Sequence, residues 1–176
     1  WTLGTTAGAN SLTATSAGLT GSPLTFNATG TAGAASKLAF TTQPSASTVA
    51  GVAFAQQPIV TIQDANGNTV TTASNEVTLT LSSGSGALSG TTAVNAVNGV
   101  ATFTGLSINL VGSDKVLSAA ATGLTGATSN TFTITNAAAS QISANGGNGQ
   151  SATVGTAVAT APSVLVRDTF GNPVAG

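Results

Sequence analysis

The stretch PIVTIQDANGNTV at residues 58–70 recurs as PSVLVRDTFGNPV at residues 162–174. Both copies keep the pattern P-x-V-x-[IV]-x-D-x-x-G-N-x-V, and they lie 104 residues apart. Alternating apolar residues are typical of a strand with one buried face, and Asp, Gly and Asn directly after it are typical of a tight turn. The same strand and turn are therefore built twice, which indicates an internal repeat.

A second match extends this repeat. LTATSAGLTG at residues 12–21 returns as LSAAATGLTG at residues 117–126, and Phe26 matches Phe132 shortly afterwards. A repeat of roughly 105 residues has the size of an immunoglobulin-like sandwich, which holds about seven short strands in about 100 residues. We therefore expect an all-β fold of tandem immunoglobulin-like β-sandwiches.

Local composition also favours strands over helices. Gly, Ala, Thr and Ser supply more than half of the chain, and Val77, Leu79 and Leu81 alternate with polar residues. Thr, Ser and Gly are poor in helix interiors, whereas a period of two fits antiparallel sheet. Gly105 interrupts this alternation and predicts a bulge or a strand end. For the central unit we expect strands near residues 37–42, 47–50, 58–64, 76–82, 91–96, 100–104, 115–122 and 129–135.

The repeat has a definite phase. Residues 1–34 match only the C-terminal part of a unit, residues 35–136 form a complete unit, and residues 137–176 match only an N-terminal part. Joined together, the two fragments fall about 31 residues short of one repeat length. We expect the chain to be a window on a longer tandem array. The alternative is that residues 137–176 of one chain complete residues 1–34 of another by strand complementation.

Charge is scarce along the whole chain. Three Lys or Arg and four Asp or Glu stand among 176 residues, and the sequence has no Cys, His, Met or Tyr. Cysteine and histidine chemistry is therefore excluded, and three scattered cations form no patch for a phosphate backbone. The sequence predicts no enzyme, no cofactor and no nucleic-acid partner. Its apolar runs are also far shorter than the ~18 residues that a membrane-spanning helix needs.

The D-x-x-G-N-x-V turn and the stretch NGVATFTGLSI at residues 98–108 resemble bacterial immunoglobulin-like repeats. This family forms tandem arrays in invasin- and intimin-like adhesins and in other large surface proteins. The resemblance covers essentially the whole chain. It implies a bacterial extracellular or cell-surface location, and it implies a passive stalk for most units, with binding confined to terminal domains. This sequence is poorer in charge than that family.

The repeated turn is the main candidate site. Asp64, Asn66 and Asn68 have the spacing of the opening of a calcium loop, but Thr69 stands where the glycine belongs, and no acid follows at the twelfth position. The second copy also replaces Asn66 by a phenylalanine. We therefore predict no metal site and interpret the shared residues as structural turns in which Asp caps backbone amides. These residues are Asp64, Gly67, Asn68, Asp168, Gly171 and Asn172.

Other side chains suggest less specific roles. Lys37 and Lys115, with Glu76, are the candidates for an intramolecular Lys–Asn isopeptide bond, and we expect both lysines instead to be solvated or to guard strand edges. We expect Phe40, Phe103 and Phe132 to anchor the core. Phe54 and Phe170 are expected in or near loops, where they could reach a neighbour.

These features predict a structural, non-enzymatic segment of a bacterial extracellular fibre, sheath or surface stalk. Edges covered by Thr, Ala and Ser carry little charge, and unguarded edges invite pairing with another copy. We therefore expect self-association into filaments, with other copies of the chain as partners. The alternative is an adhesin module that binds a host protein or a glycan, which would need an exposed aromatic or charged patch.

Overall fold

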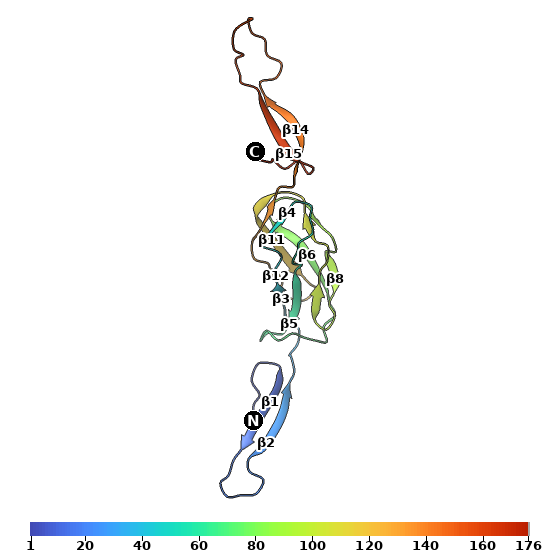
Figure 1. Ribbon diagram of the computed structural model, residues 1–176. Coiled ribbons are helices and arrows are strands. Elements are labelled where there is room, and N and C mark those ends of the chain that lie inside the picture. Colours follow the sequence, from blue (N-terminus) through green and yellow to red (C-terminus); the bar gives the residue numbers. More distant parts are fainter. Residues whose placement is uncertain (176) are drawn as a thin grey trace.

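The computed structural model describes residues 1–175 and contains fifteen strands. It is all-β and elongated, with one β-sandwich in the middle and a two-stranded hairpin at each end (Figure 1). Across residues 1–175, no helix is long and apolar enough to cross a membrane.

The two terminal hairpins are isolated antiparallel pairs. The N-terminal hairpin pairs β1 (Gly8–Ala14) with β2 (Leu24–Gly30). The C-terminal hairpin pairs β14 (Ala139–Gly146) with β15 (Ser163–Asp168). Each hairpin is a separate two-stranded sheet, and no second sheet formed by residues 1–175 pairs with it.

The central sandwich consists of two main sheets and one short ladder. The smaller sheet has the order β3 (Lys37–Thr42), β5 (Ile59–Gln63) and β9 (Val100–Thr102). The larger sheet has the order β4 (Ser47–Val49), β13 (Phe132–Thr135), β11 (Gly112–Ala120), β6 (Glu76–Ser83) and β8 (Ala93–Asn95), with β12 (Ala127–Thr128) also paired to β11. The ladder joins β7 (Leu88–Ser89) to β10 (Ser107–Ile108). All pairs of named strands are antiparallel except β4 with β13.

Among the described residues, one apolar core lies between the two main sheets. It follows directly from the alternation, because Val77 and Leu79 of β6 and the neighbouring strand's Leu117 form one buried cluster with Val60 and Ile62 of β5 in the smaller sheet. Phe103 and Phe132 are buried in this core, and Phe40 packs against it partly exposed. The expected aromatic anchors therefore lie where the sequence places them.

Phe54 differs from expectation. It is buried, and its ring meets that of Phe132 edge to face with centroids 5.4 Å apart. The prediction that Phe54 is available to a neighbour is wrong, because an aromatic ring in a loop that folds over the sandwich buries a large apolar area and completes the core.

Short elements account for the other differences. β7, β10 and β12 have two residues each and were not predicted, because two residues are too few to show alternation. β11 begins at Gly112 rather than near residue 115. Gly105 lies between β9 and β10 with a φ of 66°, which fits the expected strand end.

Candidate inter-unit junctions

The first junction, between the N-terminal hairpin and the sandwich, is organised by the Asp64 carboxylate. Oδ1 accepts hydrogen bonds from the backbone N–H groups of Asn66 and Asn68, each at 2.9 Å. Oδ2 accepts from the backbone N–H of Gly33 at 2.8 Å and from Nδ2 of Asn68 at 2.9 Å. A carboxylate has about four acceptor positions. Asp64 therefore fixes its own turn, the Asn68 side chain and the linker that enters the sandwich.

The amide of Asn68 carries the contact to the preceding hairpin. Its Nδ2 donates to the carbonyl of Thr5 at 2.8 Å, and its Oδ1 accepts from the backbone N–H of Ala7 at 2.8 Å. One side-chain amide thus pairs with the C=O and N–H of residues two apart, as a neighbouring strand would. Asp64 holds the other hydrogen of Nδ2, so the amide is oriented before it meets the hairpin.

The second junction, between the sandwich and the C-terminal hairpin, repeats the same arrangement. Oδ1 of Asp168 accepts from the backbone N–H groups of Phe170 and Asn172, each at 2.9 Å. Oδ2 accepts from the backbone N–H of Ala137 at 3.0 Å and from Nδ2 of Asn172 at 2.8 Å. Every donor lies 104 residues after its counterpart in the first junction.

Asn172 then pairs with the sandwich as Asn68 pairs with the N-terminal hairpin. Its Nδ2 donates to the carbonyl of Asn109 at 2.9 Å, and its Oδ1 accepts from the backbone N–H of Val111 at 3.1 Å. Asn109 and Val111 lie between β10 and β11, and they correspond by the repeat to Thr5 and Ala7. The structure therefore brings the six predicted turn residues into two equivalent joints between consecutive units.

The two turn glycines allow the chain to reverse after the aspartate. Gly67 has a φ of 90° and Gly171 a φ of 85°, values that favour glycine. Each glycine N–H donates to the carbonyl of the aspartate three residues before it, at 3.1 Å. The backbone of Asn68 or Asn172 is thereby placed where its amide faces the preceding unit.

The hydrogen bonds set the protonation of both aspartates. The Asn68 side chain, with the backbone N–H groups, lowers the pKa of Asp64 to about 2 from 3.8 against the opposing effect of burial. For Asp168 burial works to raise the pKa, but the bonds from Asn172, Ala137 and Phe170 together outweigh it, so the pKa is lowered. Both aspartates are therefore ionised acceptors over a wide range of pH.

The same contacts bear on the calcium-like spacing. Both oxygens of Asp64 accept N–H donors, and Oδ1 of Asn68 accepts the N–H of Ala7. A bound cation needs several oxygen ligands whose lone pairs converge on the position of the ion. At this turn those lone pairs point at N–H groups, so the geometry suits amide capping.

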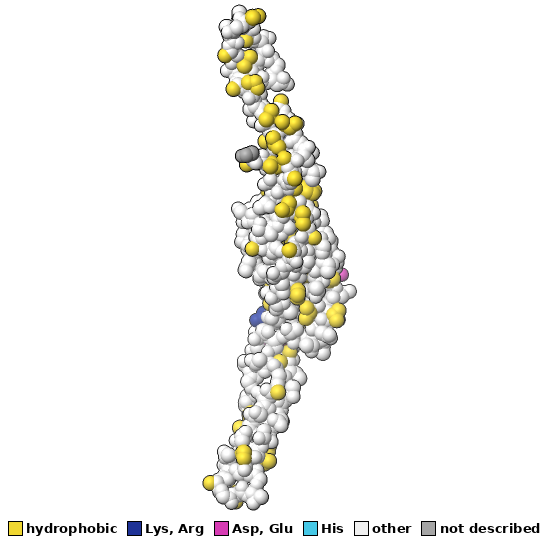
Figure 2. All heavy atoms as spheres, in the orientation of Figure 1, with side chains coloured by type: hydrophobic (Ala, Val, Ile, Leu, Met, Phe, Trp, Pro, Cys, Tyr) yellow, Lys and Arg dark blue, Asp and Glu magenta, His cyan; other side chains and the backbone are white. Residues whose placement is uncertain are grey.

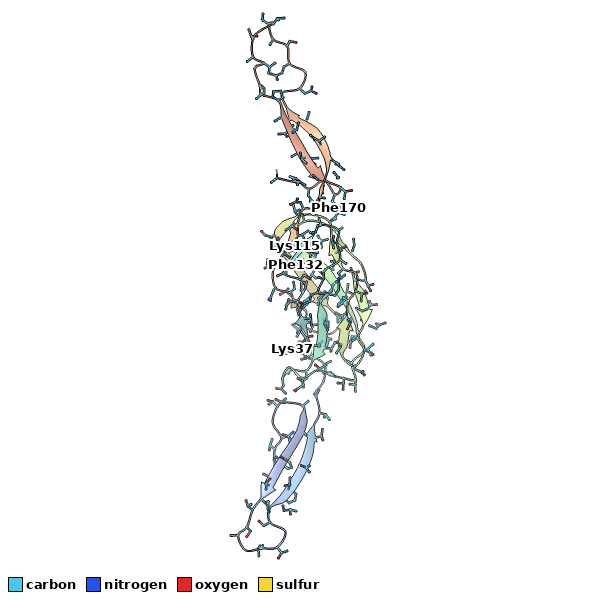
Figure 3. The ribbon with its side chains drawn as sticks, viewed as in Figure 1. Lys37, Lys115, Phe132 and Phe170 are labelled. Atoms are coloured by element: carbon cyan, nitrogen blue, oxygen red, sulfur yellow. The ribbon has the colours of Figure 1, made fainter. Side chains whose placement is uncertain are left out.

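Phe170 adds an apolar contact to the second junction, where it lies between the C-terminal hairpin and the sandwich (Figure 3). A Cβ built on Gly51 would clash with Cζ of Phe170, so the ring covers the glycine directly. Gly51 follows β4 and has a φ of 74°. The neighbour that Phe170 contacts is therefore the adjacent unit of the same chain.

Lys115 contradicts the expectation of a solvated lysine. It is fully buried, and its Nζ donates to the carbonyls of Ser85 at 2.6 Å and Val111 at 3.1 Å. A Cβ built on Gly84 would lie 2.7 Å from Cδ of Lys115, so the glycine leaves space for the lysine chain. Since Val111 also donates to Asn172, Lys115 supports the loop that receives the second junction.

The proposed isopeptide partners are not brought together. Lys115 lies one residue before Val116, which pairs with Ser83 at one end of β6, whereas Glu76 begins the other end of that strand. Lys37 is half-buried, its Nζ donates to the carbonyl of Ala65, and it lies at the opposite end of the sandwich from Lys115 (Figure 3). The three residues therefore do not form one cluster.

The receiving halves of the junctions could not be predicted from the sequence. Thr5, Ala7, Asn109 and Val111 contribute backbone groups, and so do the linker residues Gly33 and Ala137. Backbone donors and acceptors leave no side-chain signature. The signal that was present is the common spacing of 104 residues between corresponding positions.

Comparisons with known proteins yield partial structural likenesses only. No protein-family model matches the chain, and no curated protein matches it. Solved structures similar to it include two glycosyl hydrolase family 2 members, one from Bacteroides cellulosilyticus (16% identity, TM-score 0.48) and one from its strain DSM 14838 (17%, 0.46). A β-glycosidase from Bacteroides vulgatus is 21% identical with a TM-score of 0.46. These alignments cover 65% to 66% of this chain, which spans only 16% to 17% of those chains.

Acid should loosen the junctions. The folded pKa of Asp64 is about 2 and its ordinary value 3.8, so the stability that its ionised form contributes is complete above about pH 4 and declines as the pH falls toward 2. Urea unfolding between pH 5 and pH 2 measures this decline. In the Asp64→Asn, Asp168→Asn double variant we expect a lower free energy of unfolding at pH 5, because an amide oxygen cannot accept four N–H donors. We also expect its free energy of unfolding to change less between pH 5 and pH 2. A profile parallel to that of the unsubstituted protein would contradict the assignment.

Substitution of Gly51 should reveal the Phe170 contact. Gly51→Ala places a Cβ against the ring and adds about 1–2 kcal/mol for a non-glycine residue in the left-handed region. Phe170→Ala removes the ring, so it relieves the steric clash with the new Cβ but not the backbone strain at residue 51. Urea unfolding of the two single variants and the double variant gives the coupling free energy between residues 51 and 170. We expect the double variant to be more stable than the sum of the single losses implies, and strictly additive losses would exclude a direct contact.

Proposed function

We propose that this chain is a structural, non-enzymatic segment of a bacterial extracellular fibre, sheath or surface stalk built from tandem immunoglobulin-like units. The observation that carries the proposal is the recurrence of one junction, bond for bond, at 104-residue spacing. A joint that is repeated in this way sets the same relation between each pair of neighbours. A regular spacer needs this property, and a mobile linker lacks it.

The junctions combine covalent and hydrogen-bonded connections. Successive units are linked by short segments, residues 31–36 and 136–138, and each segment donates one N–H to the aspartate of the following unit. The Asn amide adds a second point of attachment to the preceding unit. Two points of attachment resist bending and twisting better than a linker alone. The elongated shape in Figure 1 is the result expected of such joints.

The surface chemistry supports a structural role over catalysis. The hollow beside the end of β6 has a single ionisable side chain, that of Glu76, among its described lining residues Asn75, Glu76, Thr78, Ala120, Ala121 and Thr122. General acid–base catalysis needs a titratable side chain within hydrogen-bond reach of the reacting proton, and a hydroxyl nucleophile needs an adjacent base or another activating group. The two buried aspartates are engaged in capping turns.

Phe54 and Phe170, the two phenylalanines expected in or near loops, give the adhesin alternative little support. Phe54 is in the core, and Phe170 packs over Gly51 at the second junction, although it is still 40% exposed. An aromatic hot spot for a host protein or a glycan needs side chains that are free to meet the ligand. The resemblance to bacterial immunoglobulin-like repeats, in which most units are stalk, agrees with this choice.

Removal of the junction amides should make the rod flexible. The chain has no cysteine, so spin labels can be placed with Thr25→Cys and Thr104→Cys across the first junction, or with Thr104→Cys and Ser163→Cys across the second. Double electron–electron resonance should give narrow distance distributions for both pairs. Asn68→Ala should broaden the first and Asn172→Ala the second, because each removes two inter-unit hydrogen bonds worth about 1 kcal/mol apiece.

Asn66→Ala is the matched control, since Asn66 lies in the same turn with an exposed side chain and contributes its backbone N–H to Asp64. It should leave the first distribution unchanged. Broad distributions in the protein without junction substitutions would refute a stiff spacer.

A further inference from the structure

Each terminal hairpin exposes a face whose counterpart in the sandwich is core. Ile142 of β14 is 70% exposed, whereas Leu38 at the corresponding position of β3 is 4% exposed. Phe26 of β2 is 48% exposed, whereas its counterpart Phe132 is 2% exposed. Leu12 and Val164 are likewise exposed, while their counterparts Leu117 and Val60 are fully buried. Figure 2 shows apolar side chains at the surface of both ends of the molecule.

The two exposed faces represent different parts of one unit. The C-terminal hairpin corresponds to β3 and β5 of the smaller sheet, and the N-terminal hairpin corresponds to β11 and β13 of the larger sheet. In the complete sandwich, Leu38, Val60, Leu117 and Phe132 belong to a single buried cluster. The exposed faces of the two hairpins therefore have the residue types that pack against each other in the sandwich.

The sandwich also shows how the edges of these two parts meet. The backbone N–H of Leu38 donates to the carbonyl of Thr125 at 2.8 Å, and the N–H of Thr125 donates to the carbonyl of Ser36 at 2.9 Å. The corresponding residues are Ile142, Thr20 and Ser140, which lie on different hairpins of this chain. The two hairpins thus carry matching edges as well as matching faces.

A third match involves the loop between β14 and β15. In the sandwich, β4 (Ser47–Val49) pairs in parallel with β13. The counterpart of β4 is the segment 152–154, which lies in that loop outside any strand, and Val154 is fully exposed. The counterpart of β13 is β2. Segment 152–154 therefore has a predicted partner strand on the other hairpin.

We propose that the C-terminal hairpin of one copy binds the N-terminal hairpin of a second copy, so that chains associate head to tail. This inference rests on the proposed structural function and names its partner, a second copy of this chain, and its surface. The faces of Ile142 and Val164 pack against those of Leu12 and Phe26, and segment 152–154 adds to β2. Residues 1–34 have no charged side chain, so no ionic repulsion opposes the contact.

Two single substitutions each inactivate one end of the chain. Ile142→Asp places a carboxylate in the apolar face of the C-terminal hairpin, and Phe26→Asp does the same in the N-terminal hairpin. Because an unpaired charge is costly to bury, each substitution should raise the protein concentration at which half of the chains are associated by roughly tenfold or more. Both positions are exposed in the single chain, so the substitutions should change the stability of the hairpins themselves little. Gln141→Lys and Thr25→Asp, at exposed neighbouring positions, are matched controls, and the counterpart of Gln141 in the sandwich is Lys37.

Light scattering coupled to size-exclusion chromatography, with negative-stain electron microscopy, measures the outcome. The unsubstituted chain and both controls should grow in mass with concentration and form linear chains. Each aspartate variant alone should stay monomeric. A mixture of the two aspartate variants should give a dimer and nothing longer, because only one intact pair of ends remains.

Other outcomes would overturn the proposal. Growth of either aspartate variant alone would mean lateral association, and a monomeric mixture would mean that the hairpins do not recognise each other. An unsubstituted chain that stays monomeric at high concentration would leave these faces to another occupant, such as further residues of a longer polypeptide. If the spin-label distances across the junctions are still narrow in that case, the stiff-spacer function stands and only the head-to-tail contact fails.

Discussion

At each boundary between units, the structure depends on one aspartate carboxylate that accepts hydrogen bonds from four N–H donors. Asp64 and Asp168 each bind two backbone amides of their own turn, one amide of the incoming linker and one asparagine side chain. A charged acceptor makes these bonds stronger than bonds between neutral groups. The turn, the linker and the asparagine therefore have one arrangement, and that arrangement determines where the next unit lies.

The scarcity of charge makes this interaction more important. Only seven side chains are charged, and two of them are used at the junctions, while Lys115 is buried behind the loop that receives the second junction. Small residues cover most of the remaining surface. Such a surface forms few long-range electrostatic contacts, so the relation between units rests on short-range hydrogen bonds and on contacts such as that of Phe170 with Gly51.

Much of the fold could be predicted because alternation and repeat spacing are properties of the sequence. The strand before Asp64, the aromatic core residues and the turn itself could all be inferred from residue types. The partners of the turn could not, since Thr5, Ala7, Asn109 and Val111 act through backbone atoms. The burial of Phe54 and Lys115 could not be predicted for a related reason. Burial of a loop residue or a lysine depends on the space that other segments leave, such as the space beside Gly84.

In this structure the asparagine amides provide the joint between consecutive units. Backbone hydrogen exchange of Ala7 and Val111, followed by nuclear magnetic resonance, tests it most directly, because these N–H groups donate to Oδ1 of Asn68 and Asn172. We expect slow exchange of both amides relative to the neighbouring Thr6 and Leu110, and loss of that protection in Asn68→Ala and Asn172→Ala. Exchange of Ala7 and Val111 at the rate of open loop amides in the unsubstituted protein would contradict it.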